Sequence, residues 1–464
     1  TVSEMGEELK RNAWMQMNEE EVQAAYLFAD SYIDFLDRAK TEREAVDYIR
    51  HLSQEHGFTA LDQADTIKPG DKLYFEAKGK VCALIIVGQQ DLQQGINLVA
   101  SHIDTPRLDL KPRPLYEAEG LSLLKTHYYG GIKKYQWLAI PLALHGVIVK
   151  KDGSQVQVQL GEDENDLVFT IADLLPHLAK EQMEQKMVDA IKGESLNALI
   201  GSRPEINGGK DPVKSAVMKL LEQHYGIEED DFTSAELQFV PAFKARHVGL
   251  DRSMVGGFGQ DDRICAYTSL KAILDTSVPQ RTAVCLFADK EEIGSSGNTG
   301  LQSLIVELLV AELMQKAGCG DYYAVRKALA DSYCLSADVN GAVDPNYLDV
   351  FEKMNNSYLG RGVVLTKYTG SRGKYDSNDA NPEFVGKIRR LFDENRVVWQ
   401  VGELGKVDAG GGGTVAQYVA RYGMEVVDCG PAILGMHSPF EISSKADIYM
   451  AYQAYQAFLS SFAD

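Results

Sequence analysis

The chain has 464 residues, 67 acidic against 47 basic, and a formal net charge of −20. Its 45% hydrophobic and 25% charged content exclude a disordered or collagen-like chain. At about 100–200 residues per domain, the length allows two to four domains, or one large domain with an insertion. Such an acidic surface repels phosphate backbones and anionic lipids, so we expect neither nucleic acid nor a membrane as partner. Acidic substrates stay possible, because a local pocket can be basic.

The cysteines and the apolar runs indicate a cytoplasmic protein. Six cysteines are spread along the chain without a CxxC pair, several of them in apolar runs such as VCALIIV. This usage is typical of buried thiols in a reducing compartment. Residues 1–14 lack the basic and then apolar stretches of a secretion signal. The longest apolar runs have strand length, whereas a membrane-spanning helix needs about 20 residues.

Residues 19–56 predict two helices, and strands follow them. The second helix should begin at Thr41, which forms a capping box with Glu44, and end at Gly57. The runs KLYFEA, VCALIIV and INLVASHID then predict strands.

Residues 106–245 differ from what surrounds them. They contain short alternating segments such as SQVQVQL and a polar stretch around 180–235. We expect an inserted β-rich domain that acts as a lid or an oligomerisation domain. Its short strands offer edges that another subunit could pair with.

From residue 246 onward, strand and helix patterns alternate. RICAYTSLKAIL predicts a helix, TAVCLFAD a buried strand, and ADIYMAYQAYQAFLSSF the closing helix. Alternation of this kind predicts an α/β fold with a doubly wound mixed sheet. Residues 1–105 and 246–464 should therefore form the catalytic domain, with its site at the carboxyl ends of strands.

Acids and histidines follow five of the predicted strands. They are His102 and Asp104, Asp261 and Asp262, Glu291 and Glu292, Asp338, and His437. We expect all of them at one edge of one sheet. Imidazole and carboxylate are the usual ligands of Zn²⁺ and related ions.

This set suits a hydrolase with two metal ions. Two ions about 3.5–4 Å apart need a bridging carboxylate and terminal ligands on each side. A further carboxylate must accept a proton without being a ligand, and the adjacent Glu291 and Glu292 suit this division of roles. Taken singly, each residue has an ordinary structural explanation. For example, Asp261 and Asp262 could cap a helix, and His102 could be a hydrogen-bonded core histidine.

Other motifs are weaker. DAGGGG (408–413) resembles a glycine loop that could hold an anion, but it lacks the residues of a nucleotide site. GSSG (294–297) lacks the spacing of a nucleophile elbow. Arg372 and Lys374 lie in a polar loop that is either solvated or substrate-binding.

The segments SHIDTPRL, GQDDR, DKEEIGS, SADVNGAVDPNY and GMHSPFE occur in this order. Together they resemble the aspartyl aminopeptidase and vacuolar aminopeptidase I family of dinuclear zinc metallopeptidases, here as a bacterial-type member. The resemblance covers essentially the whole chain. It implies an exopeptidase that acts on free N-termini of peptides, and a homo-oligomer in the form of a tetrahedral dodecamer.

The resemblance also implies roles for the residues. Asp261 would bridge two divalent ions, most simply Zn²⁺, with Co²⁺ or Mn²⁺ as alternatives. The remaining ligands would be His102 and Asp338 at one ion, and Glu292 and His437 at the other. Glu291 would be the general base that deprotonates the attacking water, and Asp104 would orient the His102 imidazole. Asp262 is the alternative bridge.

Two departures leave the preferred N-terminal residue open between acidic and broad or neutral. Eukaryotic members carry a histidine in the inserted domain that reaches a neighbouring site. LLPHLAKEQ offers His177 here, but no histidine of this domain is assigned to that role. The loop DAGGGGT also differs from its eukaryotic counterparts. No substrate-binding residue is assigned. The alternatives to an aminopeptidase are a carboxypeptidase or amidohydrolase with the same metals, or a non-catalytic assembly protein.

Overall fold

The computed structural model describes residues 6–7 and 11–463, so the stretch 1–14 lies partly outside it. The chain forms two compact units. The first unit contains the described residues up to Asp104, then Ala245–Met436, and the chain from Phe440 onward. The second unit contains Thr105–Lys244 and the short segment His437–Pro439.

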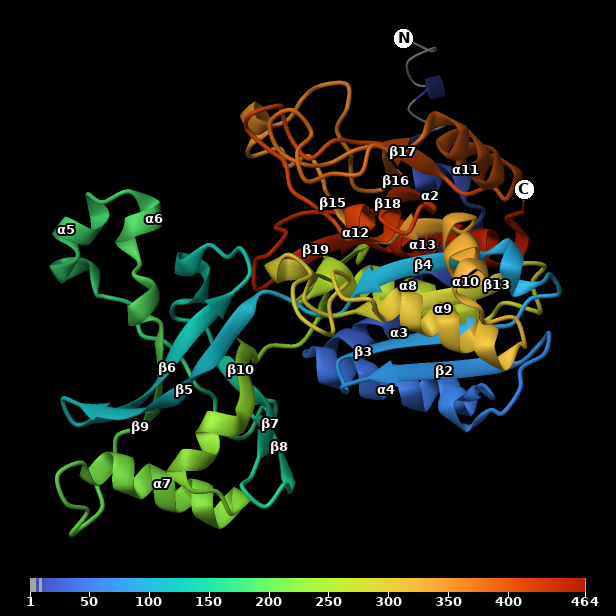
Figure 1. The fold of residues 1–464 in the computed structure, drawn as a ribbon. Helices are drawn as coiled ribbons and strands as arrows, with labels where there is room; N and C mark the ends of the chain where they lie inside the picture. Colours follow the sequence, from blue (N-terminus) through green and yellow to red (C-terminus); the bar gives the residue numbers. More distant parts are fainter. Residues whose placement is uncertain (1–5, 8–10, 464) are drawn as a thin grey trace. The chain divides into compact units, whose positions relative to one another are not determined.

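A ten-stranded mixed sheet is the centre of the first unit (Figure 1). In spatial order its strands are β1 (Thr59–Ala60), β2 (Lys72–Ala77), β3 (Val81–Ile86), β13 (Thr282–Ala288), β4 (Ile96–His102), β14 (Tyr333–Ser336), β18 (Glu425–Ile433), β16 (Val363–Thr366) and β17 (Trp399–Val401), with β15 (Asn340–Gly341) beside β18. The four central strands run parallel to one another, in the order β13, β4, β14 and β18. Their carboxyl ends therefore share one edge of the sheet.

Helices cover both faces of this sheet (Figure 1). Alternate strand residues enter two different cores: in β3, Cys82 and Leu84 pack into one, and Val81 and Ala83 into the other. Because both faces are buried, the central strands are apolar throughout. The first core includes residues of α3 (Glu19–Arg38), α4 (Glu42–Glu55), α8 (Gln260–Leu274), α11 (Pro382–Glu394) and α13 (Lys445–Ser461). The second includes α9 (Ile305–Lys316), α10 (Tyr322–Ala330) and α12 (Ala416–Ala420).

Local sequence signals account for most of these elements. The capping box of Thr41 and Glu44 begins α4, as predicted, and a second one at Asn18 begins α3. The doubly wound α/β prediction is confirmed. The helix α10 and the four-residue strand β16 are absent from our predictions, because short elements give little periodic signal.

A separate three-stranded sheet belongs to the first unit and was not predicted. Its order is β11 (Arg246–Val248), β12 (Met254–Gly257) and β19 (Glu441–Ser444). This sheet leads directly into α8, and α2 (Ala13–Gln16) packs near the start of α13.

The second unit contains a six-stranded antiparallel sheet. Its strands in spatial order are β8 (Gln155–Leu160), β7 (Leu142–Val149), β10 (Ala235–Pro241), β5 (Arg107–Ala118), β6 (Leu121–Tyr129) and β9 (Asn197–Gly201). The polar stretch around 180–235 also holds helices: α5 (Lys180–Met183), α6 (Met187–Ala190) and α7 (Pro212–Tyr225). The insertion is thus mixed, with a β-sheet as its largest element. None of the helices in the described part of the chain is long and apolar enough to cross a membrane.

Candidate metal centre

Three parallel strands deliver polar side chains to one edge of the ten-stranded sheet. The strand β4 ends with His102, and Asp338 lies two residues beyond the end of β14. After β13, Glu291 and Glu292 lie in a single turn of 3₁₀ helix, Glu291–Ile293. Parallel strands bring these side chains together because their carboxyl ends coincide.

We expected every site residue to follow a strand of the same sheet, and this expectation is wrong for Asp261 and Asp262. They follow β12 of the three-stranded sheet and lie in the first turn of α8. The peptide bond between them is cis. The backbone N–H of Asp261 donates to Glu441 Oε1 at 3.2 Å, and Asp262 Oδ2 accepts from the backbone N–H of His102 at 3.1 Å. Contacts from β19 and β4 thus fix this turn.

Four carboxylates surround the imidazole of His102. From its Nε2 atom the nearest oxygens are those of Asp261 at 3.1 Å, Glu291 at 3.5 Å, Asp338 at 3.6 Å and Glu292 at 3.9 Å. The His102 side chain is 1% exposed, so these charges interact with little screening by water.

Asp104 contacts the other side of the imidazole. His102 Nδ1 lies 3.1 Å from the Asp104 carbonyl oxygen and 3.2 Å from its carboxylate. The same carboxylate accepts the backbone N–H of Glu291 at 3.1 Å and that of Glu292 at 3.0 Å. One buried side chain therefore holds both the imidazole and the glutamate turn.

Burial raises the pKa of the Asp262, Glu291 and Asp338 carboxyls, while the His102 imidazolium lowers the pKa of each. Burial lowers the pKa of His102, but the charges of Glu291 and Asp338 and the contacts with Asp104 and Asp261 together outweigh it and hold this pKa well above its usual range. The His102 imidazolium is thus the one cation that offsets the negative charge of these carboxylates. A divalent cation would stabilise the ionised carboxylates far more effectively.

The donor set fits such an ion. The oxygens of Asp261, Asp262 and Asp338 and a nitrogen of His102 all lie within 4.8 Å of one another. His102, Glu291 and Glu292 meet the same limit. Buried imidazole and carboxylate donors at this spacing suit Zn²⁺ and similar ions.

His437 lies four residues after β18, in the segment that groups with the second unit. Its Nδ1 lies 2.8 Å from the carbonyl oxygen of Gly131 in that unit. Its role as a metal ligand stays a prediction.

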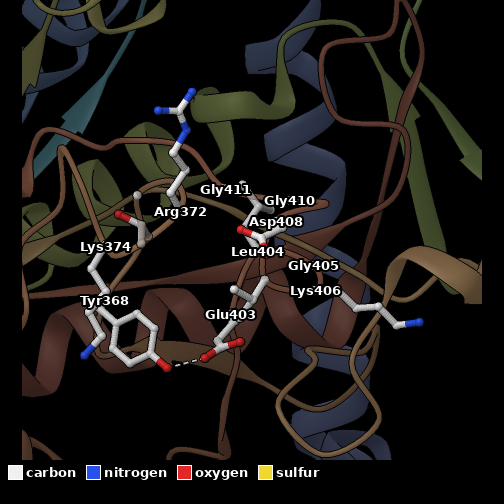
Figure 2. Close-up of a pocket in the computed structure, with 13 residues that line it drawn as sticks. Tyr368, Arg372, Lys374, Glu403, Leu404, Gly405, Lys406, Asp408, Gly410 and Gly411 are labelled. Atoms are coloured by element: carbon white, nitrogen blue, oxygen red, sulfur yellow. Dashed lines mark hydrogen bonds between the residues drawn. The ribbon is translucent and has the colours of Figure 1, made fainter.

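The two weaker loop motifs meet around a small cavity of about 50 Å³ (Figure 2). Gly370, beside Arg372 and Lys374, donates its N–H to the carbonyl of Gly412 in the glycine loop at 2.7 Å. Lys374 pairs with Asp379 at 3.0 Å. A cavity of this size is far below the 300 Å³ or more of most ligand sites, so the loops as they stand form a packed junction.

Residues 35–459 match the family of aminopeptidase I zinc metalloproteases, M18. The chain belongs to this family. A probable M18 family aminopeptidase 1 of Clostridium acetobutylicum is 50% identical over 97% of this chain and 98% of its own. The corresponding Thermotoga maritima protein is 47% identical over 97% and 98%. The predicted family and the metallo-aminopeptidase activity are thus confirmed, against a carboxypeptidase, an amidohydrolase or a non-catalytic protein.

Solved structures agree with this assignment to the M18 family. The crystal structure of the Thermotoga maritima M18 aminopeptidase is 46% identical, covers 98% of this chain and 99% of its own, and gives a TM-score of 0.94. A yeast aminopeptidase 1 dodecamer, at 20% identity, 93% and 95% coverage and a TM-score of 0.73, shares the fold.

Two site contacts of this M18 enzyme are absent from our sequence analysis. Glu441, which holds Asp261, is part of the segment GMHSPFE, but nothing in a single sequence separates it from an ordinary acid. The contact of Asp262 with the His102 backbone joins residues 160 positions apart. Only the position of Asp262 at the start of a helix indicated a structural role.

Proposed function

We propose that this aminopeptidase holds two divalent metal ions, most simply Zn²⁺, with Co²⁺ or Mn²⁺ as alternatives. His102 and Asp338 would bind one ion, Glu292 and His437 the other, and Asp261 would bridge them. The observation that carries this proposal is the ring of four carboxylates within 3.9 Å of His102 Nε2. One imidazolium offsets their charge poorly, whereas two divalent ions would balance it.

The contacts favour Asp261 over Asp262 as the bridge. One oxygen of Asp262 already accepts the backbone N–H of His102. Asp261 points its Oδ1 at His102 Nε2, and it also has an oxygen within 4.8 Å of Glu292. Asp261 thus lies between the two proposed ligand sets, while Asp262 supports the backbone beneath them.

Glu291 would be the general base. When bound, the two ions would polarise the scissile carbonyl and the attacking water. The Glu291 carboxylate would accept a proton from that water as the water oxygen attacks the carbonyl carbon. It would then pass the proton to the leaving amine as the peptide bond breaks. The Glu291 side chain is 13% exposed against 4% for Glu292, which supports Glu291 as the residue nearer to substrate.

Metal analysis tests the two-ion proposal. The chain is stripped with a chelator and titrated with Zn²⁺, and bound metal and release of an N-terminal residue are followed together. We expect full activity at two ions per chain. Full activity at a single ion per chain would contradict the proposal.

We also propose that the chain forms a homo-oligomer, a tetrahedral dodecamer, through the inserted residues 106–245. The edge strand β8 of its six-stranded sheet supports this role because unpaired edges favour association. At the other end of the sheet, Leu199 of β9 already donates its N–H to the carbonyl of Thr170 at 2.9 Å. Light scattering on the active enzyme tests it. An active monomer would overturn the assembly.

The substrates would be peptides with a free N-terminus and either an acidic or a neutral first residue. A panel of aminoacyl substrates compared by kcat/KM decides between the two. All six cysteines are free thiols, which supports the reducing cytoplasm as the location. Fractionation of the producing cell tests that location.

A further inference from the structure

The side chain of Gln260, the residue before Asp261, is completely buried, with an exposed fraction of 0%. Its Nε2 atom donates to two backbone carbonyl oxygens, those of Val255 at 3.0 Å and Glu441 at 2.7 Å. A carbonyl oxygen can only accept a hydrogen bond, so these two contacts fix which end of the amide carries the nitrogen. The Gln260 amide therefore has one defined orientation.

Two hydroxyl groups bind the oxygen of the same amide. Gln260 Oε1 accepts from the hydroxyl of Tyr32 at 3.1 Å and from that of Ser443. Burial raises the pKa of Tyr32 well above its usual range and the charge of Glu441 adds to this effect, so the phenol stays neutral and can donate. The donors and lone pairs of the Gln260 amide are thus all used, by partners from α3, β12 and β19.

Glu441 connects this amide to Asp261. Its backbone carbonyl accepts from Gln260, and its carboxylate Oε1 accepts the backbone N–H of Asp261 at 3.2 Å. Glu441 is 1% exposed, so water competes little for either contact. One residue of β19 therefore holds two consecutive residues at the start of α8.

The geometry of the helix does not fix Asp261. The backbone angles are φ −82° and ψ 102° at Asp261, and φ −119° and ψ 25° at Asp262, so neither residue is helical. Regular helical geometry therefore cannot set the direction in which the Asp261 side chain leaves the backbone. The contacts of Gln260 and Glu441 set it from one side, and the contact of Asp262 with the His102 backbone sets it from the other.

We propose that Gln260 is a positioning residue for the metal centre, which holds Glu441 and thereby the carboxylate of Asp261. This inference rests on the proposed role of Asp261 as the bridge between two ions. A bridging carboxylate must place an oxygen about 2.0–2.2 Å from each ion, so a small shift of its backbone weakens both bonds. Gln260 acts through Glu441 and Asp261 and takes no part in the chemistry itself.

The ordinary alternative is that Gln260 only stabilises the fold, and Asn97 offers a matched comparison. Asn97 is also a buried amide, 1% exposed, which donates to the carbonyl of Phe462 at 2.9 Å and accepts from Arg281 Nε at 3.0 Å. It lies near the start of β4, whereas His102 ends that strand. Loss of the Asn97 amide should therefore cost stability without moving the metal ligands.

The test compares two variants that replace a buried amide by an apolar side chain of similar size, Gln260→Met and Asn97→Leu. The intact chain is stripped of metal, its Zn²⁺ affinity is measured by competition with a chromophoric chelator, and its stability is measured by urea denaturation. We expect both variants to lose stability, and only Gln260→Met to bind zinc about 10–100-fold more weakly. Excess Zn²⁺ should restore part of its turnover of a short aminoacyl substrate.

Cobalt provides a readout that a loss of stability alone would not change. The visible absorption of bound Co²⁺ depends on its ligands and on their geometry. The Co²⁺ spectrum of Gln260→Met should therefore differ from that of the unmodified chain, and the spectrum of Asn97→Leu should match it.

Tyr32→Phe disturbs the same network less, because it removes one hydroxyl and leaves the other three hydrogen bonds of Gln260 in place. It should weaken zinc binding by a smaller factor, about two- to tenfold. This variant decides the question if Gln260→Met does not fold.

Unchanged zinc affinity or an unchanged Co²⁺ spectrum in Gln260→Met would overturn the proposal, as would unchanged zinc affinity in Tyr32→Phe. An equal loss of zinc affinity in Asn97→Leu would also overturn it, because any buried amide would then have the same effect. The two-ion proposal is judged separately, by the number of ions that the unmodified chain binds. The ratio of affinities tests Gln260 whether that number is one or two.

Discussion

The carboxylate of Asp104 lies 3.2 Å from Nδ1 of His102, and both side chains are almost fully buried. The Asp104 carboxylate also accepts both N–H groups of the glutamate turn. It therefore fixes the imidazole and positions the turn with a single charge. Acids that hold a metal-ligating imidazole in this way set its tautomer and orientation.

Asp104→Asn should weaken the metal centre without unfolding the chain. The amide keeps the size of the side chain but loses the charge and one acceptor, so the imidazole and the glutamate turn lose a fixed orientation. We expect metal affinity to fall about 10–100-fold. Competition with a chelator measures this, alongside kcat and KM at saturating Zn²⁺.

Added metal should restore part of the activity of Asp104→Asn. The exposed turn variant Asp152→Asn serves as its control and should bind metal normally. Unchanged metal affinity in Asp104→Asn would show that the carboxylate does not position the ligand.

Replacing Glu291 and Glu292 should give different failures. Glu291→Gln keeps the shape of the side chain but cannot accept a proton at neutral pH. It should retain both metal ions and lose turnover by about 10²–10⁴-fold. Glu292→Gln should lose one metal ion, because an anionic ligand is replaced by a neutral amide.

Mass spectrometry of bound metal, together with turnover at increasing Zn²⁺, separates the two residues. Excess metal should partly rescue Glu292→Gln and leave Glu291→Gln inactive. If Glu291→Gln is the variant that loses metal, the roles are exchanged. If both variants stay active, the pair is a solvated turn and catalysis depends on other residues.

Asp447 should make the stability of the fold depend on pH. Burial raises the pKa of this carboxyl to about 7, although the N–H groups of Gly360 and Gly362 lower it. In the unfolded chain an aspartate titrates near pH 3.9. Stability from the neutral carboxyl is therefore present below about pH 4 and is lost as the pH rises through about 7.

In the variant Asp447→Asn, the side chain at this position cannot ionise. Its free energy of unfolding should therefore lack the part of the fall with rising pH that Asp447 causes. The free energy of unfolding of the variant minus that of the unmodified chain should rise by on the order of 1 kcal/mol or more between about pH 5 and pH 8. Urea denaturation of the metal-free protein at several pH values measures it. A difference that stays constant with pH would contradict the assignment.

Two glycines should respond to alanine in opposite directions. At Gly411, with φ of +129°, a Cβ atom would lie 2.2 Å from the carbonyl oxygen of Gly370. Gly411→Ala should therefore open the junction of the two loops shown in Figure 2 and cost about 1–3 kcal/mol. Gly386 lies in α11 with nothing within 4 Å of such an atom, so Gly386→Ala should stabilise by about 0.5–1 kcal/mol.

Denaturation of both variants, with limited proteolysis of residues 368–411, tests this pair. Faster cleavage should be confined to Gly411→Ala. Equal stability of the two alanine variants would show that the loop junction adapts to a side chain.

Local patterns were sufficient for much of this fold. The capping box of Thr41 and Glu44 predicted the start of α4 because its hydrogen bonds join residues only three apart. Continuous apolar runs predicted β3, β4 and β13 because both faces of these strands are buried. Short elements such as β16 carried too few residues to show a period.

Most of the candidate site could also be anticipated, since His102 ends a strand and the glutamate pair and Asp338 each follow one. What the sequence by itself determined is therefore the set of elements, the acids at their ends and the family. Only the tertiary structure decided which of these acids meet His102 and which support the backbone. Asp262 reaches the His102 N–H, and Asp104 reaches the glutamate turn, across 160 and up to 188 positions. Such contacts depend on strand order, which long-range hydrogen bonding sets and no local pattern encodes.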